Sequence, residues 1–283
     1  MDSRTGKKIR LGRIFDQQSG NCLIVAYSHG VIMGPLSGMR SLDEMKRATM
    51  AMANVDGLMI APGTVTQLED AFIGKQRPAL FIHFDYQSYV RKVLPYPVGA
   101  TVELGTVESA LTAGADAIMS YQYIGHEDPE IEKLEIQRNA RIARECDRLG
   151  MVYMIEGLSA RENTHPETKH DASVIALSAR IAADLGADIV KIQPPATADS
   201  PINLEAVAEI AETCPVPLLL AGGAKCATKE MAYEIAEQSM RAGARGLVFG
   251  RNIFEADDID AEVNRYRQIV HGTAQPCEVA AQT

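Results

Sequence analysis

Residues 171–193, DASVIALSARIAADLGADIVKIQ, contain one full repeat of the pattern that decides the fold. Asp171 is a favoured N-cap residue, so we expect a helix to begin after it and to end at Gly186. Apolar residues recur through this helix as one stripe, formed by Val174, Leu177, Ile181 and Leu185. A short apolar run follows at 188–193, as is typical of a buried strand. The stretch therefore predicts a helix that leads directly into a strand.

Short apolar runs of the same kind occur eight times along the chain. They are too short for helices, and they are continuous rather than alternating, as expected of strands buried on both faces of a parallel sheet. We therefore expect strands at 22–28, 57–62, 79–84, 117–123, 152–157, 188–193, 217–223 and 246–250.

Helical patterns lie between the expected strands. Ser41 and Glu44 form a capping-box pattern at the start of one helix. Apolar side chains follow at roughly helical spacing, at Met45, Ala48 and Met52. Further helices are expected near 104–113, 129–149, 203–213, 228–242 and 258–270. The chain therefore alternates strand and helix.

Eight strands alternating with helices over about 250 residues predict an α/β protein with a single (β/α)8 TIM barrel. The alternative is an open doubly wound sheet, which would carry a Gly-x-Gly-x-x-Gly motif after its first strand. No such motif follows 22–28. We expect one domain over 1–283, with an N-terminal extension at 1–20 and a C-terminal tail at 272–283 that frays or packs on a neighbouring subunit.

Composition excludes several classes of protein. The chain of 283 residues is 46% hydrophobic and 23% charged, close to the globular average, which excludes disorder over most of its length. Its net charge is -9 and it has no basic run, so nucleic acid is not an expected partner. No segment has the apolar length of a signal peptide or a membrane span. We therefore expect a soluble, cytoplasmic protein without a membrane partner.

The cysteines and histidines do not suggest a metal centre. The five cysteines are scattered, without Cys-x-x-Cys spacing, which argues against a disulfide framework and a zinc site. They are Cys22, Cys146, Cys214, Cys226 and Cys277. His126, His165 and His170 lie in expected loops, at a spacing that fits no standard metal motif. We expect no metal, no cofactor and a reducing compartment.

Lys191 is the first candidate for chemistry. It lies inside the apolar run at 188–193, where an unpaired ammonium is costly and responds by lowering its pKa. A lysine tuned in this way is a nucleophile for carbonyl substrates. The alternative is a lysine whose stem is buried and whose ammonium reaches a salt bridge. We favour the chemical interpretation.

Glycines follow the last two expected strands. Gly222 and Gly223 end the strand at 217–223. Gly250 ends the strand at 246–250, and Arg251 follows it. TIM barrels often bind phosphate at these two positions through glycine N–H groups, and Arg251 adds a charged donor. Either loop alone is explained equally well as a tight turn. Both together favour a phosphate site.

Other strand ends carry candidates for proton transfer, because TIM barrels place catalysis at the carboxyl ends of strands. These candidates are Ser28, His29, His83, Asp85, Tyr123 and Glu156. Glu156, expected near Lys191, is equally a proton carrier and a charge partner that orients the lysine. The predicted catalytic residues are Lys191, Glu156, Tyr123, His29 and Ser28.

Four segments carry a resemblance to a known family: SHGVIMGP (28–35), GADIVKIQ (186–193), CPVPLLLAGGAK (214–225) and GLVFGRNIF (246–254). The chain resembles the archaeal-type class I fructose-bisphosphate aldolases, a group that includes aminodideoxyheptulosonate synthase and the phospho-autoinducer-2 thiolase. The resemblance runs from about residue 12 to about residue 270. It implies that Lys191 forms a Schiff base. It also implies that Gly222, Gly223, Gly250 and Arg251 hold the substrate phosphate.

The chain departs from this family at two positions. Ser28 stands where the family usually has an aspartate, and Glu156-Gly157 stands where the bisphosphate aldolases have a tyrosine. The thiolase branch also lacks that tyrosine, and it shares segments like Tyr-Ile-Gly at 123–125 and Arg-Asn-Ile-Phe at 251–254. The resemblance therefore implies a related carbon–carbon bond reaction rather than glycolytic fructose-bisphosphate cleavage.

We therefore expect a class I aldolase, or an aldolase-like acyl transferase, that makes or breaks a carbon–carbon bond. Its expected partner is a small phosphorylated carbonyl substrate of carbohydrate metabolism, and the family resemblance implies a homo-oligomer. One alternative is a phosphate-binding barrel isomerase or synthase without a covalent lysine. Another is a catalytically retired barrel that serves as a binding or scaffold protein.

Overall fold

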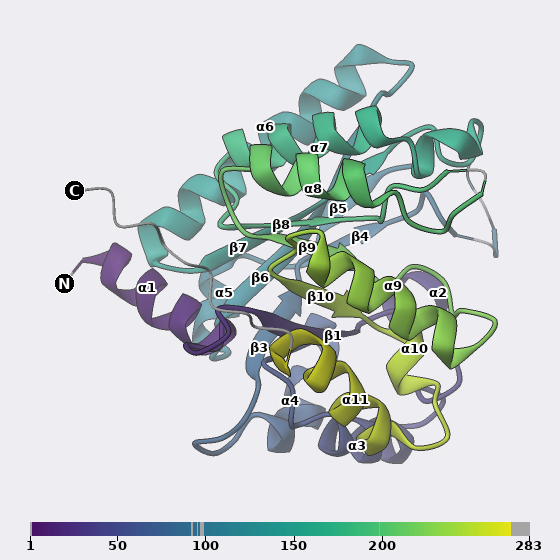
Figure 1. The fold of residues 1–283 in the computed structure, drawn as a ribbon. Coiled ribbons are helices and arrows are strands. Elements are labelled where there is room, and N and C mark those ends of the chain that lie inside the picture. The colour runs from purple at the N-terminus through teal and green to yellow at the C-terminus, as the bar shows by residue number, and fades with distance from the viewer. Residues whose placement is uncertain (1, 92, 95, 97–98, 198, 273–283) are drawn as a thin grey trace, which may run out of the picture.

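Eight parallel strands close into a barrel in the order β1-β10-β9-β8-β7-β6-β3-β2 (Figure 1). The computed structural model describes residues 2–91, 93–94, 96, 99–197 and 199–272. The barrel strands are β1 (Cys22–Tyr27), β2 (Gly57–Ile60), β3 (Ala79–His83), β6 (Ala117–Ile124), β7 (Val152–Ser159), β8 (Ile189–Ile192), β9 (Leu218–Ala221) and β10 (Gly246–Phe249). Each overlaps an expected strand. The predicted TIM barrel is confirmed, and the open sheet is wrong.

Helices cover the outside of the barrel. Those expected from the sequence are α3 (Leu42–Ala51), α5 (Val107–Thr112), α6 (Pro129–Leu149), α7 (Ala172–Asp184), α8 (Leu204–Thr213), α9 (Lys229–Arg241) and α11 (Ile259–Gly272). The additional helices are α1 (Ser3–Ile14), α2 (Gly30–Met33), α4 (Val65–Leu68) and α10 (Arg251–Phe254). Three 3-10 turns are η1 (Pro62–Thr64), η2 (Glu69–Ala71) and η3 (Pro166–Lys169).

Ser41 and Glu44 meet at the start of α3, as the capping-box pattern predicts. Ser41 Oγ accepts the Glu44 N–H at 3.2 Å. The Glu44 carboxylate accepts the N–H groups of Gly38 at 2.9 Å and Arg40 at 2.8 Å, and the Ser41 backbone N–H also stabilises it. Glu44 therefore orders the loop before α3 in addition to its place at the helix start.

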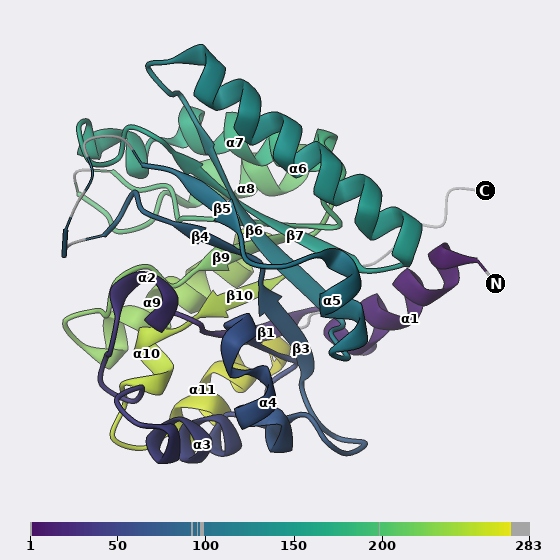
Figure 2. The ribbon, with the colours of Figure 1, turned by 180° about the vertical axis from the view of Figure 1, so that it is seen from behind.

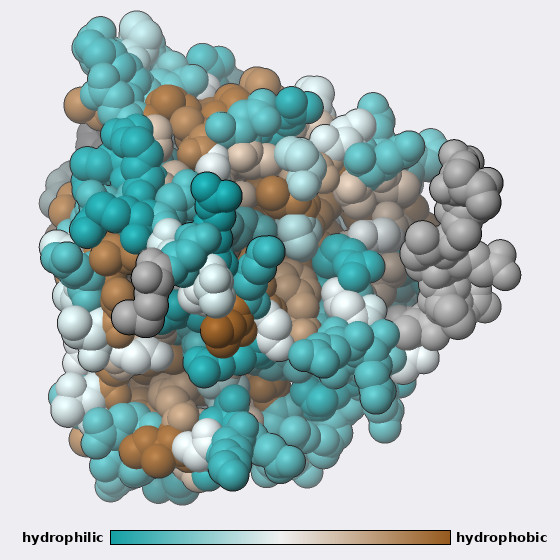
Figure 3. All heavy atoms as spheres, turned by 90° about the vertical axis from the view of Figure 1, so that its left-hand side faces the viewer, coloured by the Kyte–Doolittle hydropathy of each residue, from teal (hydrophilic) through white to brown (hydrophobic). Residues whose placement is uncertain are grey.

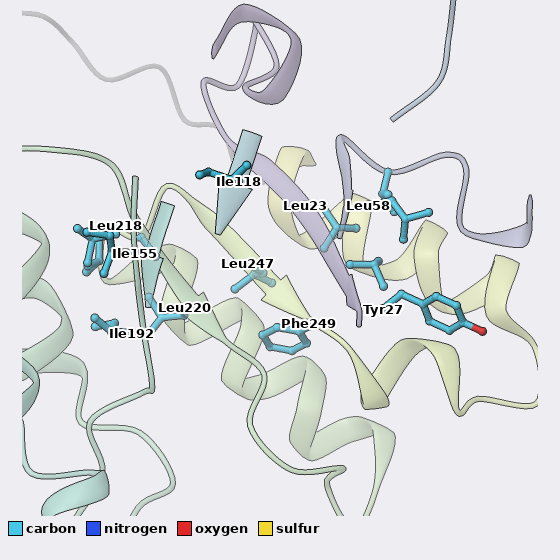
Figure 4. Close-up of a cluster of buried hydrophobic side chains, with 14 of the residues drawn as sticks. Leu23, Tyr27, Leu58, Ile118, Ile155, Ile192, Leu218, Leu220, Leu247 and Phe249 are labelled. Atoms are coloured by element: carbon cyan, nitrogen blue, oxygen red, sulfur yellow. The ribbon is translucent and has the colours of Figure 1, made fainter. Parts of the chain in front are cut away.

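The strand side chains alternate between two apolar layers. The outer layer lies between strands and helices and includes Leu23 and Ile192 (Figure 4). The inner layer fills the barrel interior and includes Ile24. Successive side chains of a strand point to opposite faces. Since Val190 and Ile192 belong to the outer layer, Lys191 between them faces the interior.

A two-stranded antiparallel hairpin extends the connection after β3. It consists of β4 (Asp85–Gln87) and β5 (Thr101–Glu103). Its strands have only three residues each, too few to show a pattern in the sequence. Figures 1 and 2 place the hairpin and α2 on the side of the barrel opposite to α1.

Helix α1 closes the barrel at the end where the strands begin. Ile14 is fully buried and belongs to the inner layer. Three ion pairs anchor the helix: Lys7 Nζ with Asp188 Oδ2 at 2.9 Å and with Asp147 Oδ1 at 2.5 Å, and Arg13 Nη1 with Asp116 Oδ1 at 3.0 Å. Figure 3 views this side, which is mostly hydrophilic with scattered hydrophobic side chains.

Three aspartates repeat at the starts of alternate barrel strands. Asp56, Asp116 and Asp188 precede β2, β6 and β8, and each accepts a backbone N–H from a neighbouring strand. The donors are Leu23 for Asp56 (2.6 Å), Leu80 for Asp116 (3.2 Å) and Tyr153 for Asp188 (2.9 Å). These carboxylates satisfy N–H groups at the edge where the sheet hydrogen bonds begin.

The apolar stripe predicted for α7 is wrong. Leu177 is 57% exposed, and the other members, Val174, Ile181 and Leu185, are only partly buried. The buried side chains of α7 are mostly small: Ile175, Ser178, Ala179, Ala182 and Ala183. A Cβ added at Gly157 of β7 would lie 2.8 Å from Ser178 Oγ. Helix and strand approach so closely that small side chains must occupy most of the space between them.

No helix among the described residues has both the length and the apolar character needed to cross a membrane. The expected N-terminal extension at 1–20 contains α1. The expected C-terminal tail at 272–283 lies outside the described residues from 273 onward.

Ile175→Ala is expected to lower the free energy of unfolding by roughly 2–5 kcal/mol, because Ile175 is buried between α7 and the barrel. Leu177→Ala should cost less than about 1 kcal/mol, because Leu177 is exposed. Urea denaturation followed by circular dichroism measures both values. Equal losses would contradict the observed packing of α7.

Candidate active site

A buried ion pair lies in the barrel interior. Glu156 of β7 and Lys191 of β8 are partners in the strand register, and Lys191 Nζ is 2.7 Å from Glu156 Oε2. The two side chains are only 4% and 8% exposed. Glu156 Oε1 accepts a hydrogen bond from Gln193 Nε2 at 3.1 Å. The pairing matters because an isolated charge is costly in the interior.

The ion pair borders a cavity of about 270 Å³, which we call the Lys191 cavity. The predicted residues that line it are His29, Tyr123, Glu156, Lys191, Gly222, Gly223, Gly250 and Arg251. Ser28 is the predicted site residue that does not line it. The barrel thus brings together residues from six strands that are far apart in the sequence.

A larger cavity of about 830 Å³ lies between the α2 segment and the loop after β2. Its lining is mainly apolar and includes Met39, Pro62 and Leu104. None of its lining residues is a lysine, arginine, aspartate, glutamate or histidine. We therefore place the candidate site in the smaller Lys191 cavity, where the titratable groups converge.

Two glycine-containing loops border the Lys191 cavity where β9 and β10 end. Gly222 and Gly223 follow β9, and Gly223 has a φ of 63°, which favours glycine. Gly250 follows β10, and a Cβ added there would lie 2.5 Å from His29 Cε1. Arg251 Nη2 donates to the Gly223 carbonyl oxygen at 2.7 Å and joins the two loops.

Asn252 makes a second link between these loops. Its Nδ2 donates to the Gly222 carbonyl oxygen at 3.3 Å, and its Oδ1 accepts the Cys226 N–H at 2.9 Å. Arg251 Nε is buried and has no hydrogen-bond partner among the described residues. The guanidinium therefore keeps donor capacity at the cavity wall, which suits an anionic ligand.

His29 is held neutral at the side of the cavity near Arg251. Its ring packs on Phe254 with a centroid separation of 5.3 Å. Burial lowers the pKa of His29 to about 3, and the positive charges of Arg251 and Lys191 act in the same direction. His29 Nδ1 has no partner in the described part of the chain. A neutral imidazole of this kind can exchange a proton with a ligand.

Ser28 lies next to a second neutral histidine. Ser28 Oγ and His83 Nδ1 are 2.8 Å apart and share a hydrogen bond. Burial lowers the pKa of His83 to about 3, with Lys191 and His29 adding to the effect. Ser28 therefore contacts a histidine behind the cavity and does not itself border the cavity around Lys191.

Asp85 and Arg138 fix the backbone of β6 at Tyr121. Asp85 Oδ2 accepts the Tyr121 N–H at 3.0 Å and Arg138 Nη1 at 2.5 Å. Arg138 Nη2 donates to the Tyr121 carbonyl oxygen at 2.6 Å. Burial raises the pKa of Asp85 to about 7, although Arg138 acts in the opposite direction. Asp85 therefore acts on the strand rather than on the cavity.

Two tyrosines of β6 line the Lys191 cavity. Tyr123 is fully buried, stacks on Tyr89 at 3.7 Å between ring centroids, and leaves its Oη unpartnered among the described residues. Burial raises the pKa of Tyr123, so the phenol stays protonated near neutral pH. Tyr121 was not predicted, although it lies opposite Glu156 in the β6–β7 register. Its place two residues before Tyr123, on the same strand face, was the signal that could have found it.

Glu162 and Lys169 are two further cavity residues that the sequence analysis missed. They lie in the loop after β7, and Glu162 is 8% exposed. Glu162 Oε2 and Lys169 Nζ are 3.9 Å apart. Burial raises the pKa of the Glu162 carboxyl. No periodic pattern marks this polar loop, so the sequence carried no signal for either residue.

The described residues contain no group of three or more His, Cys, Asp or Glu side chains that could hold a metal ion. His126 Nε2 lies 3.4 Å from Tyr89 Oη, and His170 Nδ1 lies 2.9 Å from the Pro194 carbonyl oxygen. His165 is exposed. The three loop histidines therefore belong to no metal-binding group among the described residues.

The sequence of this chain matches a known protein family and several known proteins. The family model described as DeoC/LacD family aldolase matches residues 22–256. An uncharacterized aldolase of Saccharolobus solfataricus is 28% identical, over 95% of this chain and 96% of its own length. The 3-hydroxy-5-phosphonooxypentane-2,4-dione thiolase of Yersinia pestis is 29% identical, over 94% of this chain and 82% of its own length.

Solved structures share the barrel. The crystal structure of an archaeal fructose 1,6-bisphosphate aldolase superposes with a TM-score of 0.77 and covers 94% of this chain and 99% of that protein. The two sequences are 24% identical, so this likeness shows the fold alone.

The free energy of unfolding is expected to fall as the pH drops from about 6.5 toward 3. The pKa values of His29 and His83 lie near 3 in the folded chain and near 6.5 in the unfolded chain, so acid favours the unfolded state, which binds protons first. Each histidine adds a slope of up to about 1.4 kcal/mol per pH unit. Urea denaturation at several pH values measures this slope.

His83→Asn keeps an amide next to Ser28 Oγ and should reduce the slope. His165→Asn, at an exposed position in a loop, is the control and should leave it unchanged. The same slope in wild type and His83→Asn would contradict a neutral, buried His83.

Proposed function

The chain belongs to the DeoC/LacD aldolase family and is an enzyme of the aldolase type, and we propose that its Lys191 forms a Schiff base with a phosphorylated keto substrate. The observation that carries this proposal is the inward lysine in the Lys191 cavity, paired with Glu156 at 2.7 Å and bordered by the glycine loops. A nucleophilic lysine, a proton acceptor and an anion site are the parts that this chemistry needs.

Glu156 moves protons at Lys191 in this proposal. An ammonium must lose a proton before it attacks a carbonyl carbon, and Glu156 Oε2 is within hydrogen-bond distance to take it. The amine then adds to the carbonyl to give a carbinolamine. The protonated Glu156 returns the proton to the carbinolamine hydroxyl, which leaves as water. An iminium between Lys191 and the substrate remains.

The iminium acts as the electron sink for the carbon–carbon bond. In cleavage, a base takes the proton of the substrate hydroxyl, the carbon–carbon bond breaks, and its electron pair forms an enamine with the iminium. Protonation of the enamine and hydrolysis then release the second product and free Lys191. In synthesis the same steps run in reverse. Both directions keep the covalent bond to Lys191.

His29 and Tyr123 are the proposed partners for substrate protons. His29 is neutral, because its pKa is lowered to about 3, and its Nδ1 is free to exchange a proton. Tyr123 stays protonated, because burial raises its pKa, and its Oη is suited to donate to a substrate oxygen. Ser28 acts indirectly, by holding His83 through the bond to Nδ1.

The phosphate site is proposed at Gly222, Gly223, Gly250 and Arg251. Glycines allow the backbone N–H groups of the two loops to approach an anion closely, and Arg251 supplies a charge-assisted donor. A phosphate held there positions the carbonyl over Lys191 without taking part in bond breaking. Such positioning by a remote group is a major source of rate in enzymes.

We also propose that the protein works as a homo-oligomer in the cytoplasm. The described cysteines, Cys22, Cys146, Cys214 and Cys226, are all free, which is consistent with a reducing compartment. Apolar side chains that are exposed in the single chain, such as Val93 at 73% and Leu134 at 62%, are candidates for burial between subunits.

Borohydride reduction with dihydroxyacetone phosphate is expected to add the mass of one reduced substrate to the wild-type protein and none to Lys191→Met. Intact-protein mass spectrometry measures the adduct, and peptide mapping assigns the residue. Lys169→Met is the matched control, because Lys169 lines the same cavity and should leave trapping at Lys191 intact.

An adduct on Lys169, or none with any phosphorylated ketone, would contradict the proposal. If the ligand still raises the melting temperature without an adduct, a non-covalent barrel enzyme is favoured. If it neither binds nor reacts, the retired barrel is favoured.

Arg251→Gln is expected to weaken binding of dihydroxyacetone phosphate by roughly tenfold to hundredfold, the usual effect of removing a charged hydrogen-bond donor. Binding of unphosphorylated dihydroxyacetone should change less than about twofold, because it makes no phosphate contact. Isothermal titration calorimetry measures both affinities. Equal losses for the two ligands would place the phosphate elsewhere.

A further inference from the structure

The two sides of the Lys191 cavity differ in charge. Arg251 lies on the side formed by β9 and β10, and its guanidinium has a free Nε donor. Glu156 and Glu162 lie on the side formed by β7 and the loop after it. Two strands, β8 and β9, separate β7 from β10 around the barrel. A substrate that spans the cavity therefore meets a cationic wall at one end and an acidic wall at the other.

Glu162 is a buried carboxylate without a hydrogen-bond donor. It lines the cavity and is 8% exposed. Its ion-pair partner is Lys169, with Nζ 3.9 Å from Glu162 Oε2, and no donor in the described part of the chain hydrogen-bonds to its side chain. Buried polar groups in folded proteins are normally hydrogen-bonded, so an unsatisfied carboxylate at a cavity wall is a candidate for a ligand contact.

The lysines at the acidic wall are already paired with its carboxylates. Lys169 balances Glu162, and Lys191 is paired with Glu156. Arg161, the residue before Glu162, donates to the Gly125 carbonyl oxygen at 2.5 Å and does not line the cavity. A phosphate placed here would meet buried carboxylates without a spare cation among the described residues of this wall, which is unfavourable in a poorly solvated site.

A hydroxyl group suits this wall better than a phosphate or an ammonium. A hydroxyl donates one hydrogen bond, which Glu162 accepts, and its oxygen accepts one from Lys169. An ammonium would be repelled by Lys169. Tyr123 Oη, which is unpartnered among the described residues, offers a further polar contact for a polyhydroxylated chain.

We propose that Glu162, together with Lys169, selects substrates that are phosphorylated at one end only and carry hydroxyl groups at the other end. This inference rests on the proposed function, because it assumes that the phosphate binds at Arg251 and the carbonyl at Lys191. Glu162 is a specificity residue in this account. Burial raises the pKa of its carboxyl, which is consistent with a group that lacks donors in the free protein.

The test uses a hexitol 1-phosphate and the matching hexitol 1,6-bisphosphate. These ligands differ only in the second phosphate and have no carbonyl, so their binding does not depend on a Schiff base. We expect the wild-type protein to bind the monophosphate at least roughly tenfold more tightly in isothermal titration calorimetry. Glu162→Gln keeps the shape of the side chain and removes its charge. It should weaken monophosphate binding by roughly tenfold and bring the ratio of the two affinities, monophosphate over bisphosphate, close to one.

Glu167→Gln is the matched control, because Glu167 lies in the same loop, is exposed and does not line the cavity. It should keep the wild-type preference. Melting temperatures of both variants check that the chain stays folded. Equal binding of the two ligands by the wild-type protein, or an unchanged preference in Glu162→Gln, would overturn the inference.

Trapping with dihydroxyacetone phosphate separates this inference from the proposed function. That ligand is too short to offer a second phosphate, so its reduction onto Lys191 reports the Schiff base alone. Trapping without a monophosphate preference would overturn only the role of Glu162. A preference without trapping would leave the role of Glu162 in binding supported and overturn the covalent mechanism.

Discussion

Every barrel strand has two hydrogen-bonded neighbours, and this closure decides which side chains meet. A closed ring leaves no free strand edge and directs alternate side chains of each strand toward one axis. Where the strands begin, apolar side chains fill the axis and Ile14 of α1 seals it. Where they end, β7 and β8 bring Glu156 and Lys191 into contact. The Lys191 cavity is the part of the interior that apolar side chains do not fill.

Burial then sets the charge state of each group around this cavity. Charges that remain are paired, as in Lys191 with Glu156 and Asp85 with Arg138, because an isolated ion in the interior is costly. The histidines respond differently: burial and nearby positive charge lower their pKa values to about 3, so they are neutral. Two charged groups on different walls lack hydrogen-bond partners among the described residues: Arg251 Nε, and the Glu162 carboxylate, whose ion pair with Lys169 spans 3.9 Å. The two ends of the cavity therefore differ in charge.

The fold was predictable because a closed barrel imposes a recognisable residue pattern on each of its strands and helices. A strand buried on both faces must be apolar throughout, and a helix that returns the chain must end near a glycine, so all eight strands were visible as runs. Features that leave no pattern in the neighbouring sequence could not be predicted. The three-residue strands β4 and β5 show no pattern, and the packing of α7 depends on Gly157, which lies in a different element. Large apolar residues marked the wrong face of α7 because the contact is too close to hold them.

The sequence by itself determined the barrel, the place of Lys191 within an apolar strand and the placing of glycines and Arg251 after the last two strands. Each follows from the alternation of strands and helices or from a residue's place along a strand. The sequence suggested Glu156 as a partner of Lys191, and the tertiary structure brings the two within 2.7 Å. Tertiary structure alone turned Ser28 toward His83 and brought Tyr121, Glu162 and Lys169 to the cavity. The physical reason is that hydrogen bonds, ion pairs and burial join residues distant in the chain, and a pattern along the chain does not record those distances.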